Sequence, residues 1–180
     1  MLITFPTVLT IGRLLLVPFI AYSMLQRAWL IALLLFSIAA ITDILDGYFA
    51  RKWHQETQLG ACLDPVVDKV LVISCYAVLV FAPVQGLAIP AWFLSIVLAK
   101  EVVLLGGALY WGVLKQEIEV KASWLGKLAM AVQSMLIGWV ILCSIFHWMP
   151  IRTFHLVLAA ALILVIASLI HYAYSLMVEV

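Results

Sequence analysis

Charged residues are scarce in this sequence. Only 11% of its 180 residues are Asp, Glu, Lys or Arg, whereas 67% are hydrophobic, and the mean hydropathy is +1.22. This balance is that of an integral membrane protein rather than of a soluble domain. The formal net charge of +1 provides no basic surface of the kind that binds nucleic acid, so we expect no nucleic-acid partner.

Cysteine is also rare, with three residues in the chain. Cys62, Cys75 and Cys143 show neither metal-type nor redox-type spacing. We expect Cys75 and Cys143 to be small buried hydrophobic residues within membrane spans, and we assign no role to Cys62. No Lys or Arg precedes Arg13, so the N-terminus lacks the basic region of a secretory signal and is expected to form a first span.

Long apolar runs fill the sequence, with short turns between them. A membrane crossing takes about 20 apolar residues, so the length allows about six helices and a single domain over residues 1–180. The predicted spans are residues 7–25, 29–50, 64–81, 90–114, 124–146 and 153–177. We therefore predict an all-α bundle of about six transmembrane helices. An active site has to lie within this bundle or at its surface, because no separate soluble domain fits.

Four aspartates stand out against this apolar background: Asp43, Asp46, Asp64 and Asp68. A carboxylate in a membrane is costly unless a partner compensates for its lost hydration. Asp43 and Asp46 share one helical face. Asp64 and Asp68 are one turn apart on another, so two helix ends can direct four carboxylates to one point. Hard divalent cations take oxygen ligands, often carboxylates together with substrate phosphates, so the pattern predicts a metal-phosphate site.

Neighbouring residues fit the same interpretation. Gly47 and Gly60 would let a bulky ligand approach the backbone closely. Arg51 and Lys52 would supply positive charge to a phosphate, and an arginine can do so through two parallel hydrogen bonds. From the residues alone, the aspartates could instead line an ion pathway or pair with lysines inside the membrane.

One motif shows a family resemblance: Asp43-x2-Asp46-Gly47-x2-Ala50-Arg51-x8-Gly60-x3-Asp64-x3-Asp68. It resembles the complete motif of the CDP-alcohol phosphatidyltransferases, with every fixed position and every spacer matching. The similarity continues outside the motif, at Pro6, Leu9, Thr10 and Arg13 and again at Gly126-Lys127. The resemblance implies an enzyme that transfers a phosphatidyl group from CDP-diacylglycerol to an acceptor hydroxyl and releases CMP.

The resemblance also implies roles for the motif residues. The expected ligands of two divalent ions, Mg²⁺ or Mn²⁺, are Asp43, Asp46, Asp64 and Asp68. The residues expected to seat the cytidine diphosphate are Gly47, Ala50, Arg51 and Gly60. Asp68 is also expected to act as the general base toward the attacking hydroxyl.

The acceptor is expected to meet lysines. Lys100 stands where related synthases usually have an arginine before an acidic residue, and Lys127 is a candidate for the acceptor's phosphate, with snorkelling to the headgroups as the alternative. The resemblance favours glycerol 3-phosphate, giving phosphatidylglycerophosphate. Ala108 and Ala129 replace cations that are frequent in that branch, which leaves phosphatidylglycerol, the acceptor of a cardiolipin synthase, as the alternative. A metal-coupled transporter is a hypothesis of another class.

Two further cations and the orientation complete the predictions. Arg13 could snorkel or act near the phosphates, and Lys69 could balance the acidic site or contact a headgroup. With six spans, the motif lies on the same side as both termini. The cations in that side's loops are Arg51, Lys52, Lys115 and Lys121, and those opposite are Arg27 and Arg152. The positive-inside rule then places the site at the cytoplasmic face, here of a bacterial inner membrane. The resemblance is also consistent with a homodimer.

Overall fold

The chain folds into six α-helices. The computed structural model describes residues 5–53, 58–84, 86–115 and 124–178, with side chains for 8–45, 65–84, 86–104, 106 and 124–174. The helices are α1 (Phe5–Leu25), α2 (Trp29–Trp53), α3 (Gln58–Phe81), α4 (Ala91–Lys115), α5 (Trp124–Ile145) and α6 (Ile151–Val178). Apart from one isolated bridge between Val84 and Leu87, these ranges contain no β-structure. The predicted all-α fold class is confirmed.

Three of the helices are long and apolar enough to cross a membrane. Their apolar windows are Val8–Leu25, Trp124–Ile145 and Ile151–Tyr174. A shorter apolar stretch, Trp29–Leu45, forms the first part of α2. These spans confirm a membrane protein. For α2, α3 and α4 the crossing itself stays a prediction.

The start of α3 differs from the prediction. The sequence places Asp64 near a helix N-terminus, because proline is common in a first turn. In the structure α3 begins at Gln58, so Asp64 and Pro65 lie inside the helix. The residues before Asp64 are mostly good helix formers, and the missing N–H of Pro65 does not stop a helix that begins earlier. The expected benefit of the helix dipole to Asp64 is therefore wrong, since that effect fades beyond the first turn.

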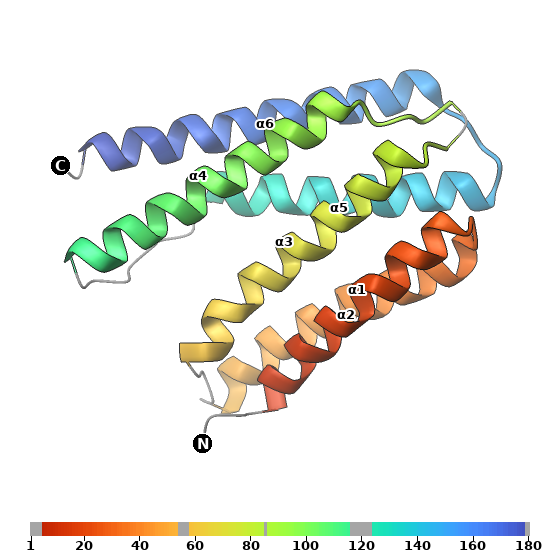
Figure 1. The fold of residues 1–180 in the computed structure, drawn as a ribbon. Coiled ribbons are helices and arrows are strands. Elements are labelled where there is room, and N and C mark those ends of the chain that lie inside the picture. The colour runs from red at the N-terminus through yellow and green to blue at the C-terminus, as the bar shows by residue number, and fades with distance from the viewer. Residues whose placement is uncertain (1–4, 54–57, 85, 116–123, 179–180) are drawn as a thin grey trace.

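The helices alternate in direction along the bundle (Figure 1). The beginning of α1, the end of α2, the beginning of α3, the end of α4, the beginning of α5 and the end of α6 all lie at one end, which we call the motif end. Helix α1 packs on α2 and α3, α5 packs on α2, α3 and α6, and α4 packs on α3 and α6. One half of the bundle is formed by α1, α2 and α3, and the other by α4, α5 and α6. The two halves approach each other at the far end and diverge toward the motif end (Figure 1).

An apolar core joins the two halves. It includes Ile20 of α1, Tyr76 and Leu79 of α3, and Leu136 and Ile141 of α5. Large apolar side chains also cover the outside of the bundle, as expected where the solvent is lipid. Two predicted core cysteines, Cys75 and Cys143, are buried free thiols. The side chain of Cys62 lies outside the described residues.

Candidate functional site

Arg13 joins carboxylates from two other helices. Its Nη1 lies 2.7 Å from Oδ1 of Asp43 on α2, and it also donates a hydrogen bond to Oδ1 of Asp68 on α3. Arg13 is 1% exposed, whereas the side chains of Asp43 and Asp68 are 41% and 29% exposed. The first and last aspartates of the motif therefore converge on one buried guanidinium, and each keeps part of its carboxylate open to its surroundings.

The position of Arg13 follows from a buried stripe along α1. Thr10, Arg13, Val17, Ile20 and Met24 repeat at alternating intervals of three and four residues, and all are buried. This spacing keeps side chains on one helical face, and that face packs on α2 and α3. Arg13 thus points between these helices, which favours a role beside the aspartates over snorkelling to the headgroups.

The other motif residues are located only by their backbone. Asp46, Gly47, Ala50 and Arg51 belong to the last turns of α2, and Gly60 and Asp64 to the first turns of α3. Their side chains lie outside the described residues. The predicted set of four metal ligands and the predicted cytidine diphosphate contacts therefore remain predictions.

The part of the site that is described fits a hard cation. Two carboxylates from neighbouring helices meet at a single point, and the group found there in this structure is a cation, the guanidinium of Arg13. Carboxylate oxygens are the ligands that Mg²⁺ and Mn²⁺ prefer. Among residues with described side chains, no group of three or more His, Cys, Asp or Glu is placed so that it could hold a metal ion. A complete site would thus draw on Asp46 and Asp64 as well.

A second charged cluster links α3 to α4. Glu101 Oε1 lies 2.7 Å from Lys100 Nζ, and Glu101 Oε2 lies 2.7 Å from Lys69 Nζ. The contact with Lys69 is an ion pair without the alignment of a hydrogen bond. Lys100 and Glu101 are both buried, which confirms that this adjacent pair faces the interior. Lys69 balances a glutamate rather than the motif aspartates, and the cluster has two positive charges against one negative.

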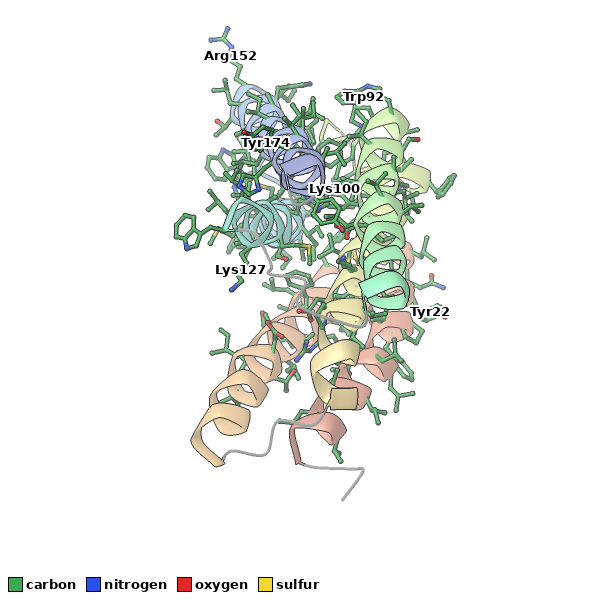
Figure 2. All side chains as sticks on the ribbon, turned by 90° about the vertical axis from the view of Figure 1, so that its left-hand side faces the viewer. Tyr22, Trp92, Lys100, Lys127, Arg152 and Tyr174 are labelled. Carbon is green, nitrogen blue, oxygen red and sulfur yellow. The ribbon has the colours of Figure 1, made fainter. Side chains whose placement is uncertain are left out.

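The two lysines expected at the acceptor phosphate lie in different surroundings. Lys127 is exposed and extends from α5 on the side away from α6, whereas Lys100 lies on the inner side of α4 (Figure 2). In the described ranges α4 does not pack against α5, so helix packing does not bring Lys100 and Lys127 together. Their shared role in binding a phosphate stays a prediction.

Gln133 of α5 is a polar residue that sequence reasoning missed. It is 0% exposed, and neither Oε1 nor Nε2 of its amide has a hydrogen-bond partner among the described residues. Its backbone carbonyl accepts a hydrogen bond of 3.1 Å from the Tyr76 hydroxyl. An unsatisfied buried amide costs about 1–3 kcal/mol, so Gln133 is not explained by packing. The sequence signal for Gln133 is weak, because the residue is uncharged. It consists of a single amide side chain within a predicted span.

A cavity of about 470 Å³ lies at the opposite end of the bundle from the motif. Its lining combines Arg27, His147 and Ser144 with apolar side chains such as Trp29 and Met149. The described lining contains no carboxylate, so the cavity lacks the chemistry of the motif. We therefore place the candidate site at the motif end, beside Arg13.

Comparisons with known proteins agree with the sequence motif. A family model described as CDP-alcohol phosphatidyltransferase matches residues 3–178. A Haemophilus influenzae protein named "CDP-diacylglycerol--glycerol-3-phosphate 3-phosphatidyltransferase" is 36% identical over 171 residues, which cover 93% of this chain and 90% of the relative. Relatives of the same name from Salmonella typhimurium and Escherichia coli K12 are 36% and 35% identical over 140 residues, covering 76% of this chain and 75% of each relative. The family match runs through all six helices.

Proposed function

Because this chain belongs to the CDP-alcohol phosphatidyltransferase family, we propose that it transfers a phosphatidyl group from CDP-diacylglycerol to glycerol 3-phosphate. The products are phosphatidylglycerophosphate and CMP. The names of the relatives support this acceptor. The structural observation that supports the reaction is the convergence of Asp43 and Asp68 on Arg13, because it gathers the ends of the family motif from separate helices.

In the proposed reaction the acceptor oxygen forms a bond to the phosphorus atom that bears the diacylglycerol. The bond from that phosphorus to the bridging oxygen breaks, and CMP leaves with the electron pair. Asp68 takes the proton of the attacking hydroxyl, since it is a partly open carboxylate at the point of convergence. Arg13 holds Asp43 and Asp68 in position during this transfer.

Members of this family generally use divalent metal ions. We infer two ions, Mg²⁺ or Mn²⁺, held by Asp43, Asp46, Asp64 and Asp68. When bound, such ions neutralise a pyrophosphate and the charge that develops on a leaving phosphate. The contacts inferred for the cytidine diphosphate are Gly47, Ala50, Arg51 and Gly60.

The phosphate of the acceptor is proposed to bind Lys127, whose exposed ammonium is available on the surface of α5. Lys100 is proposed to attract the acceptor phosphate electrostatically. It belongs to a cluster with Lys69 and Glu101 in which positive charge is in excess. The protein is proposed to lie in a bacterial inner membrane with the motif end toward the cytoplasm, where a water-soluble nucleotide can leave. A homodimer stays a prediction.

The test is CMP release by the purified protein in detergent, with CDP-diacylglycerol and Mg²⁺. Glycerol 3-phosphate and phosphatidylglycerol are offered in separate reactions, and the lipid products are identified. We expect turnover with glycerol 3-phosphate. Turnover with phosphatidylglycerol alone would replace the proposed acceptor and make the protein a cardiolipin synthase, while ion flux in liposomes without any turnover would support the transporter hypothesis.

A variant tests the base. Asp68→Asn removes the proton acceptor and keeps the size of the side chain, so we expect turnover to fall about 10²- to 10⁴-fold. Arg152→Gln is the matched control, because Arg152 is exposed and points away from the bundle at the far end (Figure 2). An Asp68→Asn enzyme as active as this control would refute the assignment.

A further inference from the structure

The unpartnered amide of Gln133 lies in the part of α5 that packs on α2 and α3, the two helices of the motif. Its neighbours along the buried face, Ala129, Leu136 and Ile137, are apolar and 0% exposed. A leucine would complete that face without leaving any polar atom unpaired. The amide of Gln133 therefore lacks a hydrogen-bond partner among the described residues, and a bound molecule could provide one.

Two contacts fix the position of Gln133 along the bundle, on the motif side of the apolar core. The first is the hydrogen bond from Tyr76, which follows Asp68 by about two turns of α3, or ~12 Å. Side chains of a helix tilt toward its N-terminus, so the Tyr76 hydroxyl lies closer to the level of Asp68 than its own Cα does. The backbone of Gln133 is fixed at that height.

The second contact is between α2 and α5. Phe36 packs over Gly138 so closely that a Cβ there would lie 3.7 Å from the ring. The two helices run in opposite directions (Figure 1). Toward the motif end, Gln133 is five residues from this contact on α5, and Asp43 is seven residues from it on α2. These separations are ~7.5 Å and ~10.5 Å along two helices that diverge in that direction (Figure 1). The Gln133 side chain also tilts toward the N-terminus of α5, which is the motif end.

We propose that Gln133 binds the hydroxyl group next to the attacking hydroxyl of a glycerol unit in the acceptor. This inference rests on the proposed function. An amide donates through Nε2 and accepts through Oε1, which matches a hydroxyl, whereas an ammonium only donates and a carboxylate only accepts. Glycerol 3-phosphate and the headgroup of phosphatidylglycerol both have two adjacent free hydroxyls. One attacks the phosphorus, and the other needs a neutral group that can both donate and accept a hydrogen bond.

Such a contact makes Gln133 a specificity-determining residue. A site that offers a buried hydrogen-bonding group to a substrate hydroxyl discriminates against an analogue without that hydroxyl, because the group is then left unpaired. The lysines cannot supply this discrimination, since the phosphate they are proposed to bind is present in both molecules. Among the described polar groups discussed for the acceptor, the Gln133 amide is therefore the one that can distinguish a glycerol from a propanediol.

The experiment compares glycerol 3-phosphate with 3-hydroxypropyl phosphate, which keeps the attacking hydroxyl and the phosphate but lacks the middle hydroxyl. We expect the unmodified enzyme to prefer glycerol 3-phosphate by about 10- to 100-fold in kcat/KM. Gln133→Leu should abolish this preference. It should lower kcat/KM for glycerol 3-phosphate, mainly through KM, and leave that for 3-hydroxypropyl phosphate within about twofold. If the enzyme uses phosphatidylglycerol, the analogue is phosphatidyl-1,3-propanediol.

Thermal stability separates this role from a structural one. Gln133→Leu removes an unsatisfied buried amide, so its Tm should be unchanged or raised. Tyr76→Phe removes the hydrogen bond to the Gln133 carbonyl and leaves the amide in place, so it should lower Tm without changing the acceptor preference. Gln26→Leu, at an exposed glutamine in the turn after α1, should change neither.

Two results overturn the inference alone. One is an equal loss with both acceptors of a pair, and the other is a lowered Tm of Gln133→Leu, which would assign the amide to packing or to an internal water. Absence of turnover by the unmodified enzyme with every glycerol acceptor is a different result, because it refutes the proposed function and removes this inference with it.

Discussion

Arg13 is the single residue on which the described part of the site depends. Its single positive charge forms ion pairs with two carboxylates, those of Asp43 and Asp68. The three side chains together therefore have one negative charge in excess. That excess favours a bound cation, whereas loss of Arg13 would leave Asp43 and Asp68 close together without compensation. Two neighbouring carboxylates repel each other strongly where water is scarce.

Replacing Arg13 should therefore damage both stability and activity. For Arg13→Ala we expect an unfolding free energy lower by about 2–4 kcal/mol, somewhat below the cost of breaking a fully buried pair, because both aspartates are partly exposed. CMP release should fall at least about 100-fold, since displaced carboxylates no longer share one point. Chemical denaturation in detergent and the CMP assay measure the two effects.

Arg13→Lys and Arg152→Ala are the controls for this prediction. Lysine keeps the charge but presents a single ammonium in place of a planar fork, so stability should recover more than activity. Arg152→Ala removes an exposed arginine at the far end and should change neither quantity. An Arg13→Ala protein with normal stability and turnover would show that the convergence of the aspartates does not depend on Arg13.

Individual residues differ in how well the sequence reveals them. The aspartates are conspicuous because a carboxylate has no place in lipid without a function. The sequence is compatible with two roles for Arg13 because nearly every position of α1 is apolar, so the buried stripe of this helix cannot be told from its lipid-facing side. Gln133 was not noticed at all, since a neutral amide is a weak signal and its lack of a partner becomes visible only when neighbouring helices are in place.

Among the helices, α3 and α4 are joined by charge as well as by apolar contact. Glu101 of α4 forms an ion pair with Lys69 of α3 through Oε2 and a second ion pair with Lys100 through Oε1. Lys100 and Glu101 lie near the middle of α4, and Lys69 lies near the middle of α3. The cluster thus links α3 to α4 part-way along the two helices.

A double-mutant cycle tests this link. We expect Glu101→Gln to lower the unfolding free energy by about 3 kcal/mol or more, because it leaves the buried Lys100 with an excess of positive charge. Lys69→Met alone should cost less, since Lys69 is more exposed than Lys100. The coupling energy between the two changes should be about 1–3 kcal/mol. Additive effects would mean that Lys69 and Glu101 do not interact in the folded protein.

The helix boundaries show where pattern reading succeeds and fails. Polar or proline-containing turns mark the ends of α1, α5 and α6, and the predicted limits there differ from the observed ones by a few residues. Helix α3 starts earlier than the sequence predicts, because proline is favoured in a first turn and disfavoured in a helix interior, whereas Pro65 lies inside α3. Sequence also gave no indication that the helices diverge at one end, since divergence depends on which faces pack, and apolar composition is similar on all faces.

For the molecule as a whole, orientation in the membrane is the prediction that decides whether the site can meet its substrates. Trp124 begins α5 at the motif end and is 78% exposed, and Trp148 lies in the turn between α5 and α6 at the far end and is 62% exposed. Cysteine substitutions at these two exposed positions can therefore report which side of the membrane each end of the bundle faces. Cys75 and Cys143 are buried, so a Cys62→Ser background should give little labelling of its own.

In spheroplasts, a membrane-impermeant maleimide should label the Trp148→Cys variant at once and the Trp124→Cys variant only after the membrane is opened. The reason is the charge bias of the loops, since Arg27 and Arg152 at the far end are outnumbered by the cations of the motif side. Adding one arginine to the turn near Trp148 should weaken the bias and produce a mixed labelling pattern. If Trp124→Cys reacts first in sealed spheroplasts, the motif faces outward, and a cytoplasmic nucleotide donor could not reach the aspartates.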